Sequence, residues 1–187
     1  MLRFTADYLV NAGVGLTVES IGLGNISQMD GDGNFEEITI SLVNIEQDAP
    51  LRNNPSYTRI SDTEIKRHNP YVVLNLYVLF TAYRTGDTAV IEQQLNDITS
   101  VIAAFQKKNV FTSAELSLPV EGNLKTEKII FEQYSMSFEQ LNHLWGILGG
   151  KYLPSVLYKV RLMCVFVDEG EEASVVESIQ RKESVLN

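Results

Sequence analysis

The sequence contains very little cysteine and histidine. Cys164 is the one cysteine among 187 residues, so no internal disulfide can form, which fits a reducing compartment. The two histidines, His68 and His143, lie in unrelated segments. Structural zinc sites take their four ligands mainly from cysteine and histidine, so this chain lacks the residues for one. A disulfide scaffold and a structural zinc domain are therefore excluded.

Basic residues are also scarce. Lysine and arginine total 15 against 24 aspartates and glutamates, which gives a formal net charge of −9. This balance argues against a nucleic-acid partner, because such binding depends on cations that neutralise phosphates. It argues equally against an anionic membrane surface and leaves a basic protein surface open as a partner.

Long hydrophobic runs are missing as well. No segment approaches the ~20 consecutive apolar residues of a membrane-spanning helix, so we expect no direct membrane insertion. The first 13 residues contain one arginine, then Asp7, and no long apolar run, unlike a secretory signal. We therefore expect synthesis in the cytoplasm without a signal peptide.

The sequence departs from the motifs of common enzyme classes at particular positions. Lys151 follows Gly150 but precedes Tyr152, where a phosphate-binding loop has serine or threonine. The pair Gly22 and Gly24 lacks the third glycine of a dinucleotide fingerprint, and no G-x-S-x-G elbow occurs. Cys164 falls on the apolar face of a predicted strand, where a free cysteine usually acts as a small hydrophobe. The sequence therefore predicts neither an enzyme nor a cofactor.

One segment invites a calcium interpretation. Asp30, Asp32 and Asn34 alternate along the chain as the first ligands of a calcium loop do. The loop's sixth position is Phe35, where glycine is needed, and its twelfth is Ser41, where a bidentate glutamate belongs. A turn joining two strands is the better interpretation, and we predict no metal site.

What is present is an ordinary globular composition, 44% hydrophobic and 21% charged. We predict one domain over residues 1–168 and an acidic tail over 169–187 that is flexible, or a weak helix around 172–182. In chain order the predicted elements are a helix 1–12, strands 17–26, 36–46 and 70–83, a helix 87–107, a strand 126–136, a helix 137–148 and a strand 155–167. This order predicts an α/β (α+β) fold with a mostly antiparallel or mixed β-sheet and helices packed on one face.

Periodicity also predicts which side chains are buried. In the helix 87–107, apolar residues recur at steps of four and three and predict a core-facing stripe of Ile91, Leu95, Ile98, Ile102 and Phe105. In the strand 36–46, both faces are apolar in the second half, so we expect cover on both sides there. We further expect that apolar residues on the second face of the sheet need cover from another subunit.

The helix 137–148 has an explicit start and end. Ser137 and Gln140 fit the capping box, in which a serine side chain and a glutamine side chain satisfy each other's backbone N–H groups. Gly149 and Gly150 end the helix, because glycine readily takes the left-handed conformation that follows a helix.

The connection 47–69 is unusually long, since most connections in a compact domain run to about 4–6 residues. Two interpretations stay open. It is a meandering surface loop with one helical turn, or an arm that orders against a partner.

Two segments carry a family resemblance: ISLVNIEQDAPLRN at 40–53 and LNHLWGILGGKYLPSVLYKVRLM at 141–163. Together with NPYVVLNLYVLFTAY and VIAAFQKKNVF between them, they resemble the cap, or tail-terminator, proteins of contractile injection systems of the antifeeding-prophage and virulence-cassette type. The resemblance covers roughly residues 1–168. It implies a tail-terminator-like fold, no catalysis and no cofactor.

The resemblance further implies a homohexameric ring that ends the inner tube and locks the last sheath layer, so the partners are other copies, the inner tube protein and the sheath protein. Sheath proteins of such machines exchange terminal strands, so we expect the cap to receive one by strand addition. The particle is either released or held at a membrane. Candidate subunit, tube and sheath contacts are Arg52, Asn53, Arg59, Lys66, Arg67, Asn142, His143, Lys151 and Tyr152. The alternatives are another structural adaptor of the same machine, at its baseplate or between tube and sheath, and an enzyme or ligand binder on an α/β scaffold.

Overall fold

The computed structural model describes residues 1–24, 26, 37–48, 57–59, 64–67, 72–84, 89–116, 124–149, 152–166 and 172–174. For 57–59, 64–67, 124, 165–166 and 172–174 it describes the backbone alone. The predicted turn at 30–34 lies outside these residues. None of the helices in the described part of the chain is long and apolar enough to span a membrane.

Helices and strands alternate along the chain. They are α1 (Leu2–Asn11), the 3₁₀ turn η1 (Val18–Ser20), β1 (Ile21–Leu23), β2 (Ile38–Gln47), β3 (Tyr57–Arg59), β4 (Glu64–Arg67), β5 (Val72–Ala82), α2 (Ala89–Lys107), β6 (Val110–Thr112), β7 (Leu124–Tyr134), α3 (Phe138–Ile147), β8 (Ser155–Phe166) and β9 (Glu172–Ser174). The predicted helices and long strands all have counterparts here. The short strands β3, β4, β6 and β9 have none among the predicted elements.

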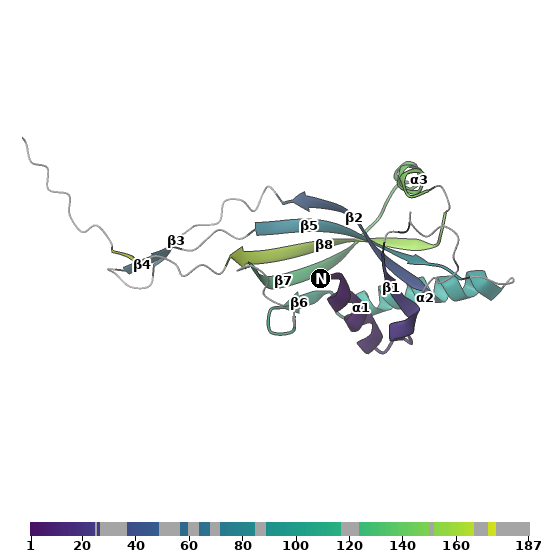
Figure 1. Ribbon diagram of the computed structural model, residues 1–187, viewed down its shortest axis with the longest axis horizontal. Coiled ribbons are helices and arrows are strands. Elements are labelled where there is room, and N and C mark those ends of the chain that lie inside the picture. Colours follow the sequence, from purple (N-terminus) through teal and green to yellow (C-terminus); the bar gives the residue numbers. More distant parts are fainter. Residues whose placement is uncertain are drawn as a thin grey trace, which may run out of the picture.

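Six strands form the main sheet, in the order β1-β2-β5-β8-β7-β6. β1 runs parallel to β2, and every other neighbouring pair is antiparallel. The mixed sheet of the predicted fold class is therefore confirmed, with β5 and β8 at its centre. α1 and α2 lie on one side of this sheet, and α3 lies on the other (Figure 1).

The core lies between the sheet and the pair α1 and α2. Its centre is aromatic: Phe105 of α2 stacks on Phe131 of β7 at 4.3 Å between ring centroids, and lies 4.9 Å from Tyr158 of β8. α1 is tied to α2 by the Tyr8 hydroxyl, which donates to the Ala104 carbonyl at 2.7 Å. α1 ends where Gly13 takes a φ of 71°, a conformation that glycine adopts without steric cost.

The predicted stripe on α2 is partly wrong. Ile98 and Phe105 are buried as predicted, but Ile91 and Leu95 are 71% and 62% exposed. The buried side of α2 is Gln94, Asp97, Ile98, Val101, Ala104 and Phe105. Each residue advances the helix by about 100°, so this side is turned around the axis relative to the predicted stripe. The first half of α2 consequently presents apolar side chains outward and polar ones inward.

The prediction for β2 is reversed. The first half is buried on both faces from Ile38 to Ser41, and the second half is open, with Leu42 40% and Ile45 54% exposed. The reason lies in the neighbouring strand: β1 ends at Leu23, opposite Ile40, so nothing in the described residues pairs with that edge of β2 beyond this point. A register shift between Leu42 and Asn44 also disrupts the pairing with β5 there.

A second, three-stranded sheet has the order β3-β4-β9, with antiparallel pairs. It lies beyond the end of the main sheet (Figure 1). β3 and β4 fall inside the long connection 47–69, for which the sequence allowed two interpretations, a surface loop or an arm. The two strands pair as a hairpin. The weak helix expected around 172–182 is wrong at 172–174, because these residues pair with β4 as a strand. The domain limits at 168 and 169 stay a prediction.

Candidate functional site

The predicted contact residues fall into two separate groups. Asn142 and His143 are exposed on α3, and Tyr152 follows at 65% exposure. Arg59 lies in β3, and Lys66 and Arg67 lie in β4, at the other end of the molecule (Figure 1). Arg52, Asn53 and Lys151 lie outside the described residues. The described members therefore do not form a single site.

α3 is held in place by its cap and by one large side chain. The predicted capping box is present: the Gln140 N–H donates to Ser137 Oγ at 3.2 Å, and the Ser137 N–H donates to Gln140 Oε1 at 2.9 Å. Trp145 is buried and meets the Tyr152 ring edge-on at 5.8 Å. The outer side of α3 thereby gains a fixed orientation.

α3 also exposes two apolar side chains that the sequence reasoning missed. Phe138 is 89% and Ile147 is 81% exposed. Ile147 falls off the face formed by Leu141, Leu144 and Trp145, so helical periodicity contained the signal for it. Phe138 lies on that face by its spacing but is the first residue of the helix, and periodicity alone predicts it as buried. Both side chains are available for contact with a partner.

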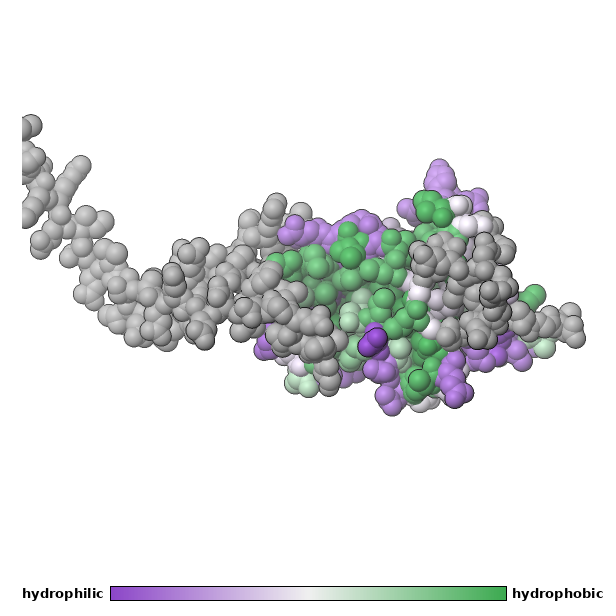
Figure 2. Space-filling view, viewed as in Figure 1, coloured by the Kyte–Doolittle hydropathy of each residue, from purple (hydrophilic) through white to green (hydrophobic). Residues whose placement is uncertain are grey.

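A larger apolar area lies on the main sheet. Leu42 and Ile45 of β2 pair with Val78 and Leu76 of β5, so they point to the same side as the core and α1. α1 does not reach them, and apolar side chains gather over the strands beside α1 in Figure 2. The exposed apolar area of the sheet is therefore on its helix-bearing side.

On the opposite side of the sheet, we had expected apolar groups to need cover from another subunit, but Val73 is buried within the chain. Leu79 and Leu157 are already buried within the chain. Arg161 lies 3.7 Å from Asp48 and 3.5 Å from Glu132, measured between side-chain nitrogen and oxygen. This side carries an ion-pair network across strands.

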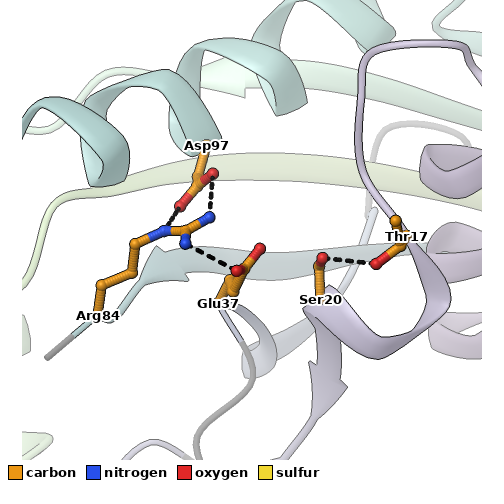
Figure 3. A network of polar contacts seen from close by, with 5 residues as sticks. All are labelled: Thr17, Ser20, Glu37, Arg84 and Asp97. Atoms are coloured by element: carbon orange, nitrogen blue, oxygen red, sulfur yellow. Dashed lines mark hydrogen bonds and ion pairs between the residues drawn. The ribbon is translucent and has the colours of Figure 1, made fainter. Parts of the chain in front are cut away.

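A groove runs between α1 and β1. Its volume is about 210 Å³, and its lining is Arg3, Ala6, Asp7, Val10, Val18, Ile21 and Leu23. Val18 and Leu23 are 73% and 43% exposed. Beside it, the hydroxyls of Thr17 and Ser20 are 2.8 Å apart and close the η1 turn (Figure 3). The lining of the groove is mostly apolar, with Arg3 and Asp7 as its charged members.

An ion-pair network holds the first half of α2. Arg84, just after β5, donates from Nε to Asp97 Oδ2 at 2.7 Å and from Nη2 to Asp97 Oδ1 at 3.1 Å, a bidentate pair (Figure 3). Its Nη1 lies 2.7 Å from Oε1 of Glu37, the residue just before β2. The hydrogen bond with Asp97 raises the pKa of Arg84, so the guanidinium stays charged. The network fixes the direction in which Ile91 and Leu95 project.

The described residues provide little for catalysis. Cys164 is 1% exposed, and burial raises the pKa of its thiol, which disfavours the reactive thiolate. Among the residues whose side chains are described, no three histidine, cysteine, aspartate or glutamate side chains are grouped so as to hold a metal ion. The arrangement is suited to protein contacts through its apolar surfaces.

Comparison with known proteins bears on this arrangement. The profile of the family described as "Pvc16 N-terminal domain" matches residues 6–178. No curated protein is similar enough to this chain to count as a match.

Two solved structures share the fold. One is the anti-feeding prophage cap (AFP tube terminating cap), with a TM-score of 0.61 and 17% identity over 97% of this chain and 60% of that chain. The other is the sheath/tube terminator of an extracellular contractile injection system, PVC, in its extended state, with a TM-score of 0.55 and 16% identity over 100% of this chain and 63% of that chain. This chain thus spans less than two thirds of the length of either structure.

Proposed function

The chain belongs to the Pvc16 N-terminal domain family, and from this premise we propose that it is a structural cap, or tail terminator, of a contractile injection system. The observation that supports the proposal most is the shared fold: nearly the whole chain aligns with a tube terminating cap and with a sheath/tube terminator. In this role the chain forms a homohexameric ring that ends the inner tube and locks the last sheath layer, without catalysis.

The surfaces of the chain support this role. A ring needs a contact between two different surfaces of one chain that closes by rotation. The chain has several exposed apolar surfaces on separate elements: Leu42 and Ile45 on β2, Ile91 and Leu95 on α2, and Phe138 and Ile147 on α3. A monomer leaves all of them in water, whereas a ring bound to a tube and a sheath can cover several.

The open edge of β2 supports the sheath contact. From Leu42 to Gln47, the edge of β2 away from β5 has no partner strand among the described residues. Unpaired backbone groups on such an edge can accept an added strand, with main-chain hydrogen bonds giving affinity and side-chain positions giving specificity. We assign this edge to a terminal strand of the sheath protein.

The test uses assembled particles. Removing the chain from a producing strain is expected to give tubes of uncontrolled length or unstable sheaths under the electron microscope, because nothing ends the polymer. Particles of normal length and stability contradict the proposal.

A label on the chain then gives its position. We expect the label at the end of the particle distal to the baseplate. A label at the baseplate, or along the tube, instead indicates another structural adaptor of the same machine.

A further inference from the structure

The apolar side chains on the first half of α2 form a ridge, defined here as Ile91 and Leu95. They are four residues apart, so they lie one above the other on the same side of the helix. Both are more than half exposed, and the Arg84–Asp97 pair on the other side of α2 prevents the helix from turning them inward. The ridge is therefore a fixed outward feature of the fold.

The groove between α1 and β1 is the concave counterpart. It is about 210 Å³ in volume, and a cavity of about 150 Å³ already holds a group the size of benzene. Two aliphatic side chains such as isoleucine and leucine are therefore of the right size for it. An amphipathic helix laid into an apolar groove is a common recognition mode, with anchors at steps of three and four residues.

The charges at the two surfaces complement each other. Arg3 lines the groove and is exposed, and Glu92 follows Ile91 on the exposed part of α2. Asp7 also lines the groove, so opposite charges pair only when Glu92 approaches the side of Arg3, the cation among the described lining residues. Placing the ridge in the groove with Glu92 toward Arg3 pairs opposite charges and fixes the direction of the helix.

Ridge and groove of one chain cannot satisfy each other, because both remain exposed in the folded chain. We propose that the ridge of one copy docks in the groove of the next copy, and that this contact is the repeating interface of the ring. The inference rests on the proposed function and deepens it. It assigns the two unlike surfaces that a contact between rotated copies requires.

The experiment uses a ridge variant, Leu95→Asp, and a groove variant, Val18→Asp. Both positions are exposed, so the folded chain tolerates the change. Far-ultraviolet circular dichroism checks that each variant is folded. Gln93→Asp serves as the control, because it places the same charge on an exposed position of α2 that is not part of the ridge.

Native mass spectrometry measures the assembly. We expect rings from the wild-type chain and from Gln93→Asp, and 21.0 kDa monomers from each of the other two variants. Mixing the two variants should restore one intact contact per pair, since one supplies the groove and the other the ridge. The mixture is therefore expected to form 1:1 dimers and to stop there, because the outer surfaces of each dimer are both mutated.

The inference is overturned by rings from either single variant, or by a mixture that stays monomeric. A wild-type chain that stays monomeric also overturns it, while the labelled particle independently shows whether the chain is a cap. Exchanging the charges gives a second measurement. Arg3→Glu is expected to weaken the ring, and adding Glu92→Arg to the same chain is expected to restore it.

Discussion

The ion pair between Arg84 and Asp97 makes a quantitative prediction about stability. Replacing Arg84 with alanine leaves the Asp97 carboxylate, whose side chain is 10% exposed, without its bidentate partner. Breaking a fully buried pair costs about 3–5 kcal/mol. Because the Arg84 side chain is itself 24% exposed, we expect the lower end, about 3 kcal/mol lost from the free energy of unfolding for Arg84→Ala.

Removing the carboxylate instead should cost less. In Asp97→Ala, the guanidinium keeps Glu37 as a partner at 2.7 Å and has access to water, so we expect a loss of about 2 kcal/mol. In the double variant, the second substitution removes no further Arg84–Asp97 interaction, because the first has already removed it. The double-mutant cycle should therefore give a coupling energy of about 2 kcal/mol.

Urea unfolding provides the assay. Trp145 is the single tryptophan and is buried, so its fluorescence follows unfolding, and far-ultraviolet circular dichroism supplies an independent probe. Gln93→Ala, at an exposed site on the same helix, is the control and should stay within about 0.5 kcal/mol of the wild type. Losses for Arg84 and Asp97 that simply add, with a coupling energy below about 0.5 kcal/mol, would refute the reasoning.

Two further predictions concern single side chains. Ser137→Ala removes the capping box of α3 and should lower the free energy of unfolding by about 1 kcal/mol in the same urea assay, whereas Ser137→Asp, which still accepts from the Gln140 N–H, should retain most of it. Burial raises the pKa of Tyr158 to about 12, against about 10 in the unfolded chain. The neutral hydroxyl therefore makes its full contribution to the free energy of unfolding below pH 10, and this contribution is lost as the pH rises from about 10 to 12. Linkage makes that loss about 3 kcal/mol. Urea unfolding across this range should show that the free energy of unfolding declines more steeply with pH for the wild type than for Tyr158→Phe. Parallel curves would mean that ionisation of Tyr158 does not cause the decline.

The best-predicted parts of the fold are those whose signal is local. One face of β5 is apolar along its whole length, and the capping box depends on two residues three positions apart, so neither needs knowledge of distant segments. The mixed sheet followed from the order of such elements. The three-residue strands β3, β6 and β9 are too short to show an alternation, and only their pairing with other strands defines them.

Burial was harder to predict because periodicity identifies an apolar side but not what covers it. Ile91 and Leu95 belong to an apolar stripe, yet the core beneath α2 begins only further along, near Ile98. Asp97, the polar residue just before Ile98, was the available signal, since a buried carboxylate requires a cation and Arg84 lies nearby in the chain. The burial prediction for β2 was wrong for the same reason: periodicity does not show where β1 ends, and the cover of β2 depends on that point.

The contact surfaces were the least predictable part. Asn142, His143 and Tyr152, predicted as contacts, are exposed, as a contact residue must be. The groove between α1 and β1 was missed, because it is formed by the packing of two segments and not by a pattern in either. Whether the predicted residues touch a subunit, the tube or the sheath stays a prediction.

The small sheet has a consequence for the order in which the chain folds and opens. Its pairing of Glu64 with Ser174 joins segments that flank β5 to β8 in the sequence, and the pairing of Val72 with Cys164 brings these segments close together. Before β5 has paired with β8, forming the small sheet requires closing a very long loop. Only a few backbone hydrogen bonds reward that closure. β9 should therefore dock last during folding and detach first in the native state, and its amide hydrogens should exchange with solvent by a local opening while the aromatic core stays closed.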